Sequence, residues 1–343
     1  MTKKKISLHL NSNKPNDFYS LIQSIENTIS DIQKLEIIVH IDEGDIEMMS
    51  EINNINSNYP NLVKYIETNL IESFSDAWKP LNLLLKETSK DIQIISCISD
   101  NLRFEKKNWD IILLSYSEKF DDNIYRLRCS KYKFQKYDDI WQCGYEPDSY
   151  AFYSKKWLET VGEWCPCIGP DTYHECISFY MNKILSDYNR DIVVSEMFFS
   201  GETVSTGLSL KSRLNRTRIY YKAFFKLMSY EIQVKALEKA NLLISKINTK
   251  PIRKLNNYKI NFLSHKITNL RRRFDFFAHR GSKDHPIRGP ISNIIFIIWC
   301  YIKFFDNLII KIIKFLYIQN YLKKIIKNSK KYEELKKILE NEK

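Results

Sequence analysis

Two nearly continuous apolar runs most strongly limit what this chain can fold into. The first spans Leu35–Ile41 (LEIIVHI), the second spans Asp91–Ile98 (DIQIISCI), and each leads directly into acidic residues. Runs of this length and composition are typical of strands covered on both faces of a parallel sheet. They predict an α/β fold with polar side chains at the ends of its strands.

The segments around these runs alternate between strand and helix patterns. Their spacing predicts further strands over 6–10 and 63–66, and helices over 18–29, 46–55, 76–88 and 171–186. Such alternation favours an open sheet, in which ligands bind beyond the carboxyl ends of the strands. We therefore expect any site to lie in the loops that follow the strands.

Charge divides the chain into two parts. Residues 1–210 carry 22 Lys and Arg against 32 Asp and Glu, whereas residues 211–343 carry 31 against 9. The predicted domains are accordingly an acidic α/β domain over 1–210 and a basic, mostly helical region over 211–343, with a linker at 271–290. A strongly basic region favours a polyanionic partner, either acidic lipid or nucleic acid.

The segment 291–326 is rich in Ile, Phe, Trp and Tyr, but charged residues interrupt it before a membrane span can accumulate. The pattern predicts an amphipathic helix lying on a membrane surface, with lysines that reach anionic headgroups. The alternative is an ordinary helix packed on the α/β domain or on a second copy of the chain in a homodimer.

Cysteine usage and the N-terminus bear on the compartment. Seven cysteines, an odd number, do not form the pattern of a secreted disulfide framework. The N-terminus has three lysines but no long apolar segment or small-residue cleavage site. We expect a cytoplasmic protein, peripheral on the inner face of the cytoplasmic membrane.

Three acidic clusters carry the chemistry that the sequence predicts. Asp42 and Asp45 follow the first apolar run and can accept hydrogen bonds from a base or a ribose, although an acidic turn around Gly44 is the alternative. Asp100-Asn101 follows the second run and is suited to a metal-bound diphosphate, or else to a turn or helix cap.

The third cluster begins at Asp171, after Gly169-Pro170, and includes His174. Asp171 is a candidate general base, with a helix N-cap as the alternative. Cys165, Cys167, His174 and Cys176 are soft ligand types, but their spacing is not that of a common zinc module, and buried cysteines often act as small apolar residues. His174 could instead contribute to a divalent-metal or diphosphate site.

Taken in order, several segments resemble bacterial family-2-like glycosyltransferases of the GT-A fold. The segments that carry the resemblance are 8–15 (LHLNSNKP), 36–45 (EIIVHIDEGD), 78–82 (WKPLN), 91–104 (DIQIISCISDNLRF), 109–110 (WD), 150–157 (YAFYSKKW) and 171–172 (DT). The resemblance covers about residues 5–200. It implies an open mixed sheet of Rossmann-like, GT-A type.

The resemblance also implies an activity, a hexosyltransferase-type transfer from a nucleotide sugar, UDP-type favoured, to a glycan or lipid-linked acceptor in surface polysaccharide biosynthesis. The implied donor-site residues are Asn11, Asp42, Asp45, Asn82 and Asp100. The implied ligands of Mn²⁺ or Mg²⁺ are Asp100, Asn101 and His174, and the implied base is Asp171. Where the family usually has paired aspartates, this chain has Asp100-Asn101, so an amide replaces one carboxylate.

Two other classes of function remain open at this point. A nucleic-acid-binding protein is suggested by the basic back half and its Arg271-Arg272-Arg273 cluster, but it leaves the acidic loops unexplained, so nucleic acid is the less favoured partner. A non-catalytic relative that acts as a scaffold through the tail is the other alternative.

Overall fold

The computed structural model describes residues 4–71, 76–129, 140–145, 148–167, 169–185, 188–194, 199–201, 222–247 and 258–269. The chain divides into two compact units, Met1–Ile260 and Asn261–Lys343. Among the described residues, no helix combines the length and the apolar character needed to cross a bilayer. The expected linker at 271–290 and the expected membrane-surface helix at 291–326 lie outside the described residues.

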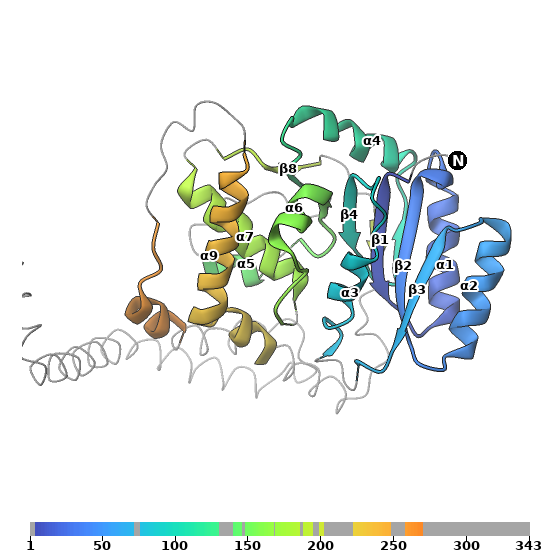
Figure 1. Cartoon of the computed structure of the whole chain (residues 1–343), viewed down its shortest axis with the longest axis horizontal. Coiled ribbons are helices and arrows are strands. Elements are labelled where there is room, and N and C mark those ends of the chain that lie inside the picture. Colours follow the sequence, from blue (N-terminus) through green and yellow to red (C-terminus); the bar gives the residue numbers. More distant parts are fainter. Residues whose placement is uncertain are drawn as a thin grey trace, which may run out of the picture. The chain divides into compact units, whose positions relative to one another are not determined.

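A seven-stranded sheet forms the centre of the first unit, in the order β3-β2-β1-β4-β7-β6-β8 (Figure 1). Its strands are β1 (Ile6–Asn11), β2 (Leu35–Asp42), β3 (Val63–Thr68), β4 (Ile94–Cys97), β6 (Arg126–Arg128), β7 (Phe152–Ser154) and β8 (Asp191–Val193). Strands β1 to β4 are parallel, and β7 runs antiparallel to β4 and β6. The expected open mixed α/β sheet is confirmed.

Helices and one small sheet complete the described elements. The helices are α1 (Pro15–Glu26), α2 (Ile46–Asn58), α3 (Leu81–Lys86), α4 (Trp109–Ser115), α5 (Ile140–Tyr145), α6 (Lys155–Val161), α7 (Pro170–Ile184) and α9 (Tyr230–Ser245), with 3-10 turns at Ile32–Lys34 and Ser117–Lys119. The small antiparallel sheet pairs β5 (Leu102–Phe104) with β9 (Phe199–Gly201). The described parts of 211–343 are helical at 222–227, in α9 and at 262–269.

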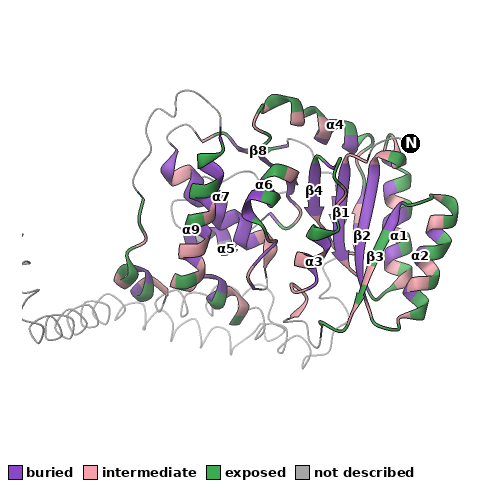
Figure 2. Ribbon diagram, viewed as in Figure 1, coloured by how far each residue is buried: buried purple, intermediate pink, exposed green. Residues whose placement is uncertain are grey.

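The core is built on β1 and β2, which are buried along almost their whole length (Figure 2). Their apolar side chains pack with one face of α1, where Phe18, Leu21 and Ile25 recur at helical spacing and are fully buried. Strand β3 forms one edge of the sheet and is largely exposed, with Lys64 and Glu67 on its surface. Charged side chains on an edge strand discourage pairing with a further strand.

The chain reverses direction across the sheet at β1. From β1 it continues through α1 to β2 on one side, and it later returns to β4 on the other side. The register places Leu8 of β1 beside Ile37 of β2 and beside Ser96 of β4. The carboxyl ends of β1 and β4 therefore form a topological switch point, the place at which open α/β sheets bind their ligands.

Two expectations about individual elements need correction. The helix expected over 76–88 is α3, which begins only at Leu81, since residues 77–80 form a turn that ends in Pro80 at the cap position. The region after 144, where only the helix over 171–186 was expected, also contains α6, β7, β8 and β9. Those strands have three residues each, too few for a period of two to stand out in sequence.

Helix α9 packs on α7 and belongs to the first compact unit. The buried Gln233 of α9 accepts a hydrogen bond from Tyr180 Oη of α7 at 2.8 Å. Lys235 of α9 forms an ion pair at 2.7 Å with Glu163, in the loop between α6 and α7. Helix α9, although it belongs to the basic region, thus packs against the α/β unit.

Asp110 in the first turn of α4 joins that helix to the loop after α1. Its carboxylate is fully buried and accepts hydrogen bonds from the backbone N–H of Ser30 at 2.9 Å and from Ser30 Oγ. Asp110→Ala should lower the free energy of unfolding by about 1–3 kcal/mol, because it removes both hydrogen bonds that the buried carboxylate accepts from Ser30. Urea unfolding of the variant and the wild type measures this; a loss below about 0.5 kcal/mol, typical of surface positions, would contradict it.

Candidate active site

Ser12 and Asp100 face each other across the switch point. Ser12 follows β1, Asp100 follows β4, and Ser12 Oγ donates a hydrogen bond to Asp100 Oδ2 at 2.8 Å. Burial raises the pKa of the Asp100 carboxyl and the nearby Asp17 adds to the rise, while the bond from Ser12 and the charge of Lys14 act in the opposite direction. A half-buried carboxylate therefore lies where the loops after β1 and β4 meet.

Polar side chains extend this site along the carboxyl ends of the parallel strands. Asn11, the last residue of β1, donates through Nδ2 to the Ala77 carbonyl at 2.6 Å. Its Oδ1 is buried and has no hydrogen-bond partner among the described residues. Asp42 ends β2 on the other side of β1 and is half-buried. Asn11 and Asp42 thus end β1 and β2, and Asp100 lies in the loop that follows the adjacent strand β4.

The loop after β4 is held by side chains on both sides. Ser99 Oγ donates to Asn101 Oδ1 at 2.5 Å and lies 3.2 Å from Tyr150 Oη. Arg103 donates through Nη1 to the Asp100 carbonyl at 2.8 Å. The Asn101 amide oxygen thus accepts a hydrogen bond from Ser99. Of Asp100 and Asn101, Asp100 is the residue whose carboxylate can bind a cation.

Asp171 lies in the first turn of α7. The cap position of this helix is Gly169, with φ +104°, so Asp171 is not the N-cap that was the alternative interpretation. Burial raises the pKa of Asp171 to about 6, the charges of Glu175 and Asp148 add to the rise, and Arg126 and the Thr172 backbone N–H oppose it.

The charge of Asp171 reaches the end of β4. Burial raises the pKa of the Cys97 thiol to about 12, and the Asp171 carboxylate adds to that rise. Cys97 is the last residue of β4, and only Ile98 separates it from the Ser99–Asn101 loop. Asp171 therefore acts electrostatically on the strand that precedes Asp100.

Two residues expected at the donor site, Asp45 and Asn82, make structural contacts. Asp45 is the N-cap of α2, where its Oδ1 accepts from the Met48 N–H at 3.0 Å, and Gly44 with φ +79° completes the preceding turn. Asn82 accepts from the Trp164 N–H at 2.7 Å and donates to the Cys165 carbonyl at 3.0 Å. Both side chains already fix a neighbouring segment.

His174 lies in an aromatic environment. It is fully buried, its Nδ1 accepts from Trp157 Nε1 at 3.1 Å, and its ring centroid is 4.7 Å from that of Tyr153. Burial lowers its pKa to about 3. Cys165, Cys167 and Cys176 are buried free thiols. In the part of the chain that the structure describes, no three His, Cys, Asp or Glu side chains come together to hold a metal ion.

A divalent cation nevertheless suits Asp100. Mg²⁺ and Mn²⁺ accept a single protein carboxylate when the phosphate oxygens of a ligand and water complete the coordination shell. Asp100 has a carboxylate group that can supply oxygen ligands, and it is half-buried at the switch point. The Asp100 carboxylate is therefore compatible with a cation that is bound to the phosphates of a nucleotide.

Several residues at this edge were not predicted from the sequence. Ser12, Lys14, Asp17, Ser99 and Tyr150 all contact or influence the two candidate residues after β4. The available signal for Ser12 and Lys14 was their place in the loop directly after a buried strand. Tyr150 gave no signal of its own, because its contact with Ser99 depends on the chain folding back beside β4.

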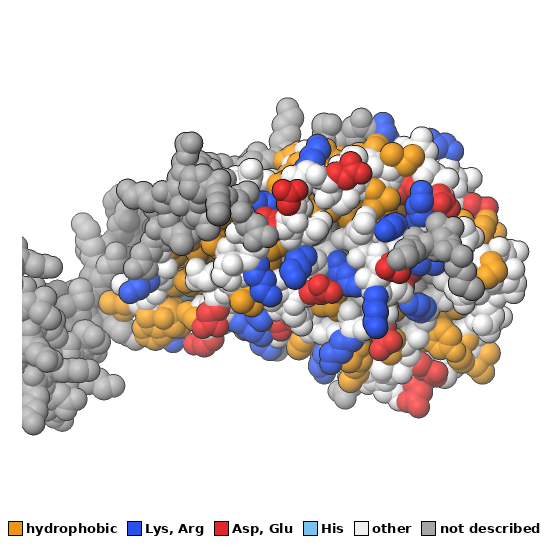
Figure 3. All heavy atoms as spheres, turned by 45° about the horizontal axis from the view of Figure 1, so that its top comes forward, with side chains coloured by type: hydrophobic (Ala, Val, Ile, Leu, Met, Phe, Trp, Pro, Cys, Tyr) orange, Lys and Arg blue, Asp and Glu red, His pale blue; other side chains and the backbone are white. Residues whose placement is uncertain are grey.

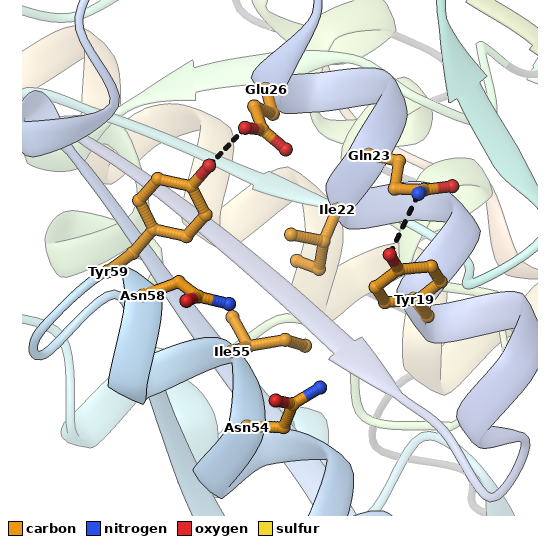
Figure 4. A pocket seen from close by; sticks show the side chains of 8 residues that line it. All are labelled: Tyr19, Ile22, Gln23, Glu26, Asn54, Ile55, Asn58 and Tyr59. Carbon is orange, nitrogen blue, oxygen red and sulfur yellow. Dashed lines mark hydrogen bonds between the residues drawn. The ribbon is translucent and has the colours of Figure 1, made fainter.

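A separate surface groove lies between α1 and α2 (Figure 4). It has a volume of about 470 Å³, and it is lined by Tyr19, Ile22, Gln23, Glu26, Asn54, Ile55, Asn58 and Tyr59. Both helices run away from the carboxyl ends of the strands, and most of these residues belong to their later turns. The groove is therefore distinct from the switch point.

Comparison with known proteins gives a partial likeness in fold. No protein-family model matches the chain, and no curated protein matches it in sequence. Among solved structures, a mannosyltransferase from Pyrobaculum calidifontis, in complex with GDP-Man and Mn²⁺, is 14% identical with a TM-score of 0.48, over 71% of this chain and 75% of that one. S. aureus TarS with UDP-GlcNAc is 15% identical with a TM-score of 0.44, over 79% and 81%.

The likeness extends to a different class of enzyme. The 4-diphosphocytidyl-2C-methyl-D-erythritol synthase of Anaerococcus prevotii is 12% identical with a TM-score of 0.37, over 65% of this chain and 98% of that one. Scores of this size describe a partly shared arrangement of the backbone. The chemistry of this chain has to be argued from its own side chains.

Histidine titration tests the described environment of the site. His9 of β1 accepts from Trp164 Nε1 at 3.0 Å, and burial lowers its pKa to about 3, as it does for His174. Of the six histidines, these two should remain neutral at about pH 5, where an unperturbed histidine is charged. NMR of protein labelled at histidine measures this, with assignment by His9→Gln and His174→Gln; protonation of either ring near pH 6.5 would contradict its burial.

Proposed function

We propose that the protein is a nucleotide-sugar-dependent glycosyltransferase of the GT-A type. The single observation that supports this most directly is the Ser12–Asp100 hydrogen bond across the switch point, with a further polar residue ending β2 beside it. This is the edge at which open α/β sheets bind nucleotides. A carboxylate suited to a cation, polar groups suited to a nucleoside and a carboxylate with a raised pKa are the parts that such a transfer needs.

The donor would bind across the carboxyl ends of β1, β2 and β4. In this proposal Asp42 and Asn11 bind the nucleoside, and Asp100 binds Mn²⁺ or Mg²⁺ on the diphosphate. The cation, when bound, neutralises the charge that develops on the leaving diphosphate. Asn101 and His174 remain proposed neighbours of the cation, and Asp45 and Asn82 remain proposed parts of the donor site that act through the segments they fix.

Asp171 is the proposed general base. With a pKa of about 6, its carboxyl is mostly ionised at neutral pH yet basic enough to accept a proton. It would take the proton of the acceptor hydroxyl while that oxygen forms a bond to the anomeric carbon. The bond from the anomeric carbon to the diphosphate oxygen breaks, and the diphosphate leaves with the electron pair. A direct displacement of this kind inverts the anomeric centre.

The wider setting is part of the same proposal. We propose a hexose donor, UDP-linked in preference, and a glycan or lipid-linked acceptor of surface polysaccharide biosynthesis. In this proposal residues 1–210 form the catalytic domain and residues 211–343 form the basic region. Residues 291–326 lie on the inner face of the cytoplasmic membrane. A second copy of the chain is a further partner, in a homodimer. On the face shown in Figure 3, basic and acidic side chains of the described residues are interspersed.

Nucleotide binding provides the first test. UDP, GDP, CMP and dTDP are titrated by calorimetry with and without Mn²⁺. One of them should bind in a manganese-dependent manner, and Asp42→Ala should weaken that binding by about 10- to 150-fold, the effect of removing a hydrogen bond to a charged group. Glu43→Ala is the matched control, because it removes the same charge from an exposed position in the same turn. Equal effects of the two substitutions would contradict the role of Asp42.

Turnover provides the second test. Asp171→Asn should lower kcat by about 10²- to 10⁴-fold, the usual contribution of a general base, and should leave nucleotide binding almost unchanged. In the wild type, kcat should fall as the pH drops below about 6, because the Asp171 carboxyl becomes protonated. Glu159→Gln, exposed on α6, serves as the control. Full activity of Asp171→Asn would exclude the proposed base.

A further inference from the structure

A cluster of buried charges lies behind the candidate site and takes no part in the proposed chemistry. Arg126 and Arg128 of β6 point to the same side of their strand and meet Glu175 of α7. The two arginines and Glu175 are at most 2% exposed. Asp148 and Asp191 complete the cluster, and Arg126 Nη1 lies 3.2 Å from Asp191 Oδ2.

Glu175 is the residue that connects this cluster to Asp171. The two side chains are four residues apart on α7 and therefore share one face of the helix. Glu175 Oε1 lies 2.8 Å from Arg128 Nη1, and Glu175 Oε2 contacts Arg126. The first turns of α7, which carry Asp171, are thereby fixed to β6.

The same carboxylate also leads to the loop after β4. Glu175 Oε2 accepts a hydrogen bond from the Asp148 N–H at 3.4 Å, and Asp148 Oδ1 accepts one from the Tyr150 N–H at 3.3 Å. Tyr150 Oη in turn lies 3.2 Å from Ser99 Oγ, which donates to Asn101. A continuous chain of contacts thus runs from the helix of the candidate base to the loop of the candidate cation ligand.

Stability alone does not account for such a cluster. Burying five charged groups removes them from water, and ion pairing often does no more than offset that cost compared with apolar side chains of similar size. The cluster adds a fixed geometry, because each guanidinium donates hydrogen bonds only in its own plane. Fixed geometry matters where two groups on different elements must act on one ligand.

We propose that Glu175 is a positioning residue. With Arg126 and Arg128, it fixes the position of Asp171 relative to the Ser99–Asn101 loop. The catalytic consequence rests on the proposed function, but the mechanical link does not. Loss of the Glu175 charge releases both segments together, and the distance between the candidate base and the donor then varies. A displacement of about 1 Å can cost on the order of 10²-fold in rate.

The test compares two buried carboxylates of the same sheet. Glu175→Gln keeps the shape of the side chain and removes its charge. Glu36→Gln is the matched control, since Glu36 is fully buried in β2 and paired with Lys64 at 2.8 Å, but lies at the amino end of the strands. Hydrogen exchange of the full-length protein is followed in peptides covering 97–104 and 169–177.

Glu175→Gln should speed exchange in both peptides, whereas Glu36→Gln should leave both unchanged. Glu175→Gln should also lower kcat by at least about tenfold and change the donor KM by less than about threefold. This is the pattern expected when groups are no longer aligned in the transition state. Faster exchange in 169–177 alone would overturn the link between the two segments. An unchanged kcat despite faster exchange in both peptides would overturn the positioning role of Glu175 in catalysis.

Tyr150→Phe keeps the test decisive if Glu175→Gln fails to fold. It removes only the hydroxyl group near Ser99 and keeps the ring that packs at 5.8 Å from Phe199. It should speed exchange in 97–104 and leave 169–177 unchanged; no effect in 97–104 would overturn the link. If the wild type transfers no sugar, the proposed function fails, while the exchange results still decide whether the two segments are coupled.

Discussion

The pairing of β1 with β2 on one side and β4 on the other is the constraint on which the rest of the structure depends. Three parallel strands with apolar side chains on both faces must be covered by helices, so their connections leave the sheet at its ends. The loops after β1 and β4 diverge at that edge. Polar groups such as Ser12 and Asp100 can remain there because the apolar core lies below them.

Burial determines the electrostatics of this edge. Partial burial favours the neutral form of the carboxyl groups and raises the pKa of both Asp100 and Asp171. Full burial keeps His9 and His174 neutral, and tryptophan N–H groups satisfy one nitrogen of each ring. The two carboxylates are therefore the groups suited to charge and proton transfer, whereas the two histidines organise the packing around them.

The sequence was sufficient to predict the parallel half of the fold. The runs 35–41 and 91–98 became β2 and β4, and the apolar spacing after Phe18 became α1, because buried strands and amphipathic helices impose strong periodic patterns. The antiparallel half was missed, since β6, β7 and β8 have three residues each. The alternation Arg126-Leu127-Arg128 places both arginines on one face, but their buried partners come from α7 and β8 and are recognisable only in three dimensions.

The site was predictable to a similar degree. Asp42 ends β2, Asp100 follows β4 and Asp171 lies in the first turn of α7, and the sequence pattern predicted each of these three elements. Sequence could not separate these carboxylates from Asp45, whose side chain caps α2, because a helix cap and a ligand contact use the same residue type. Long-range contacts such as that of Tyr150 with Ser99 leave no local pattern.

A nucleotide diphosphate and its cation are proposed to bind at the switch point between β1 and β4. Anomalous diffraction from a crystal of the protein grown with Mn²⁺ and the nucleotide that binds would locate the cation directly. One manganese peak is expected within coordination distance of the Asp100 carboxylate, about 2.0–2.2 Å from oxygen, with the diphosphate beside it. A peak at another position, or nucleotide density away from the carboxyl ends of β1 and β4, would contradict it.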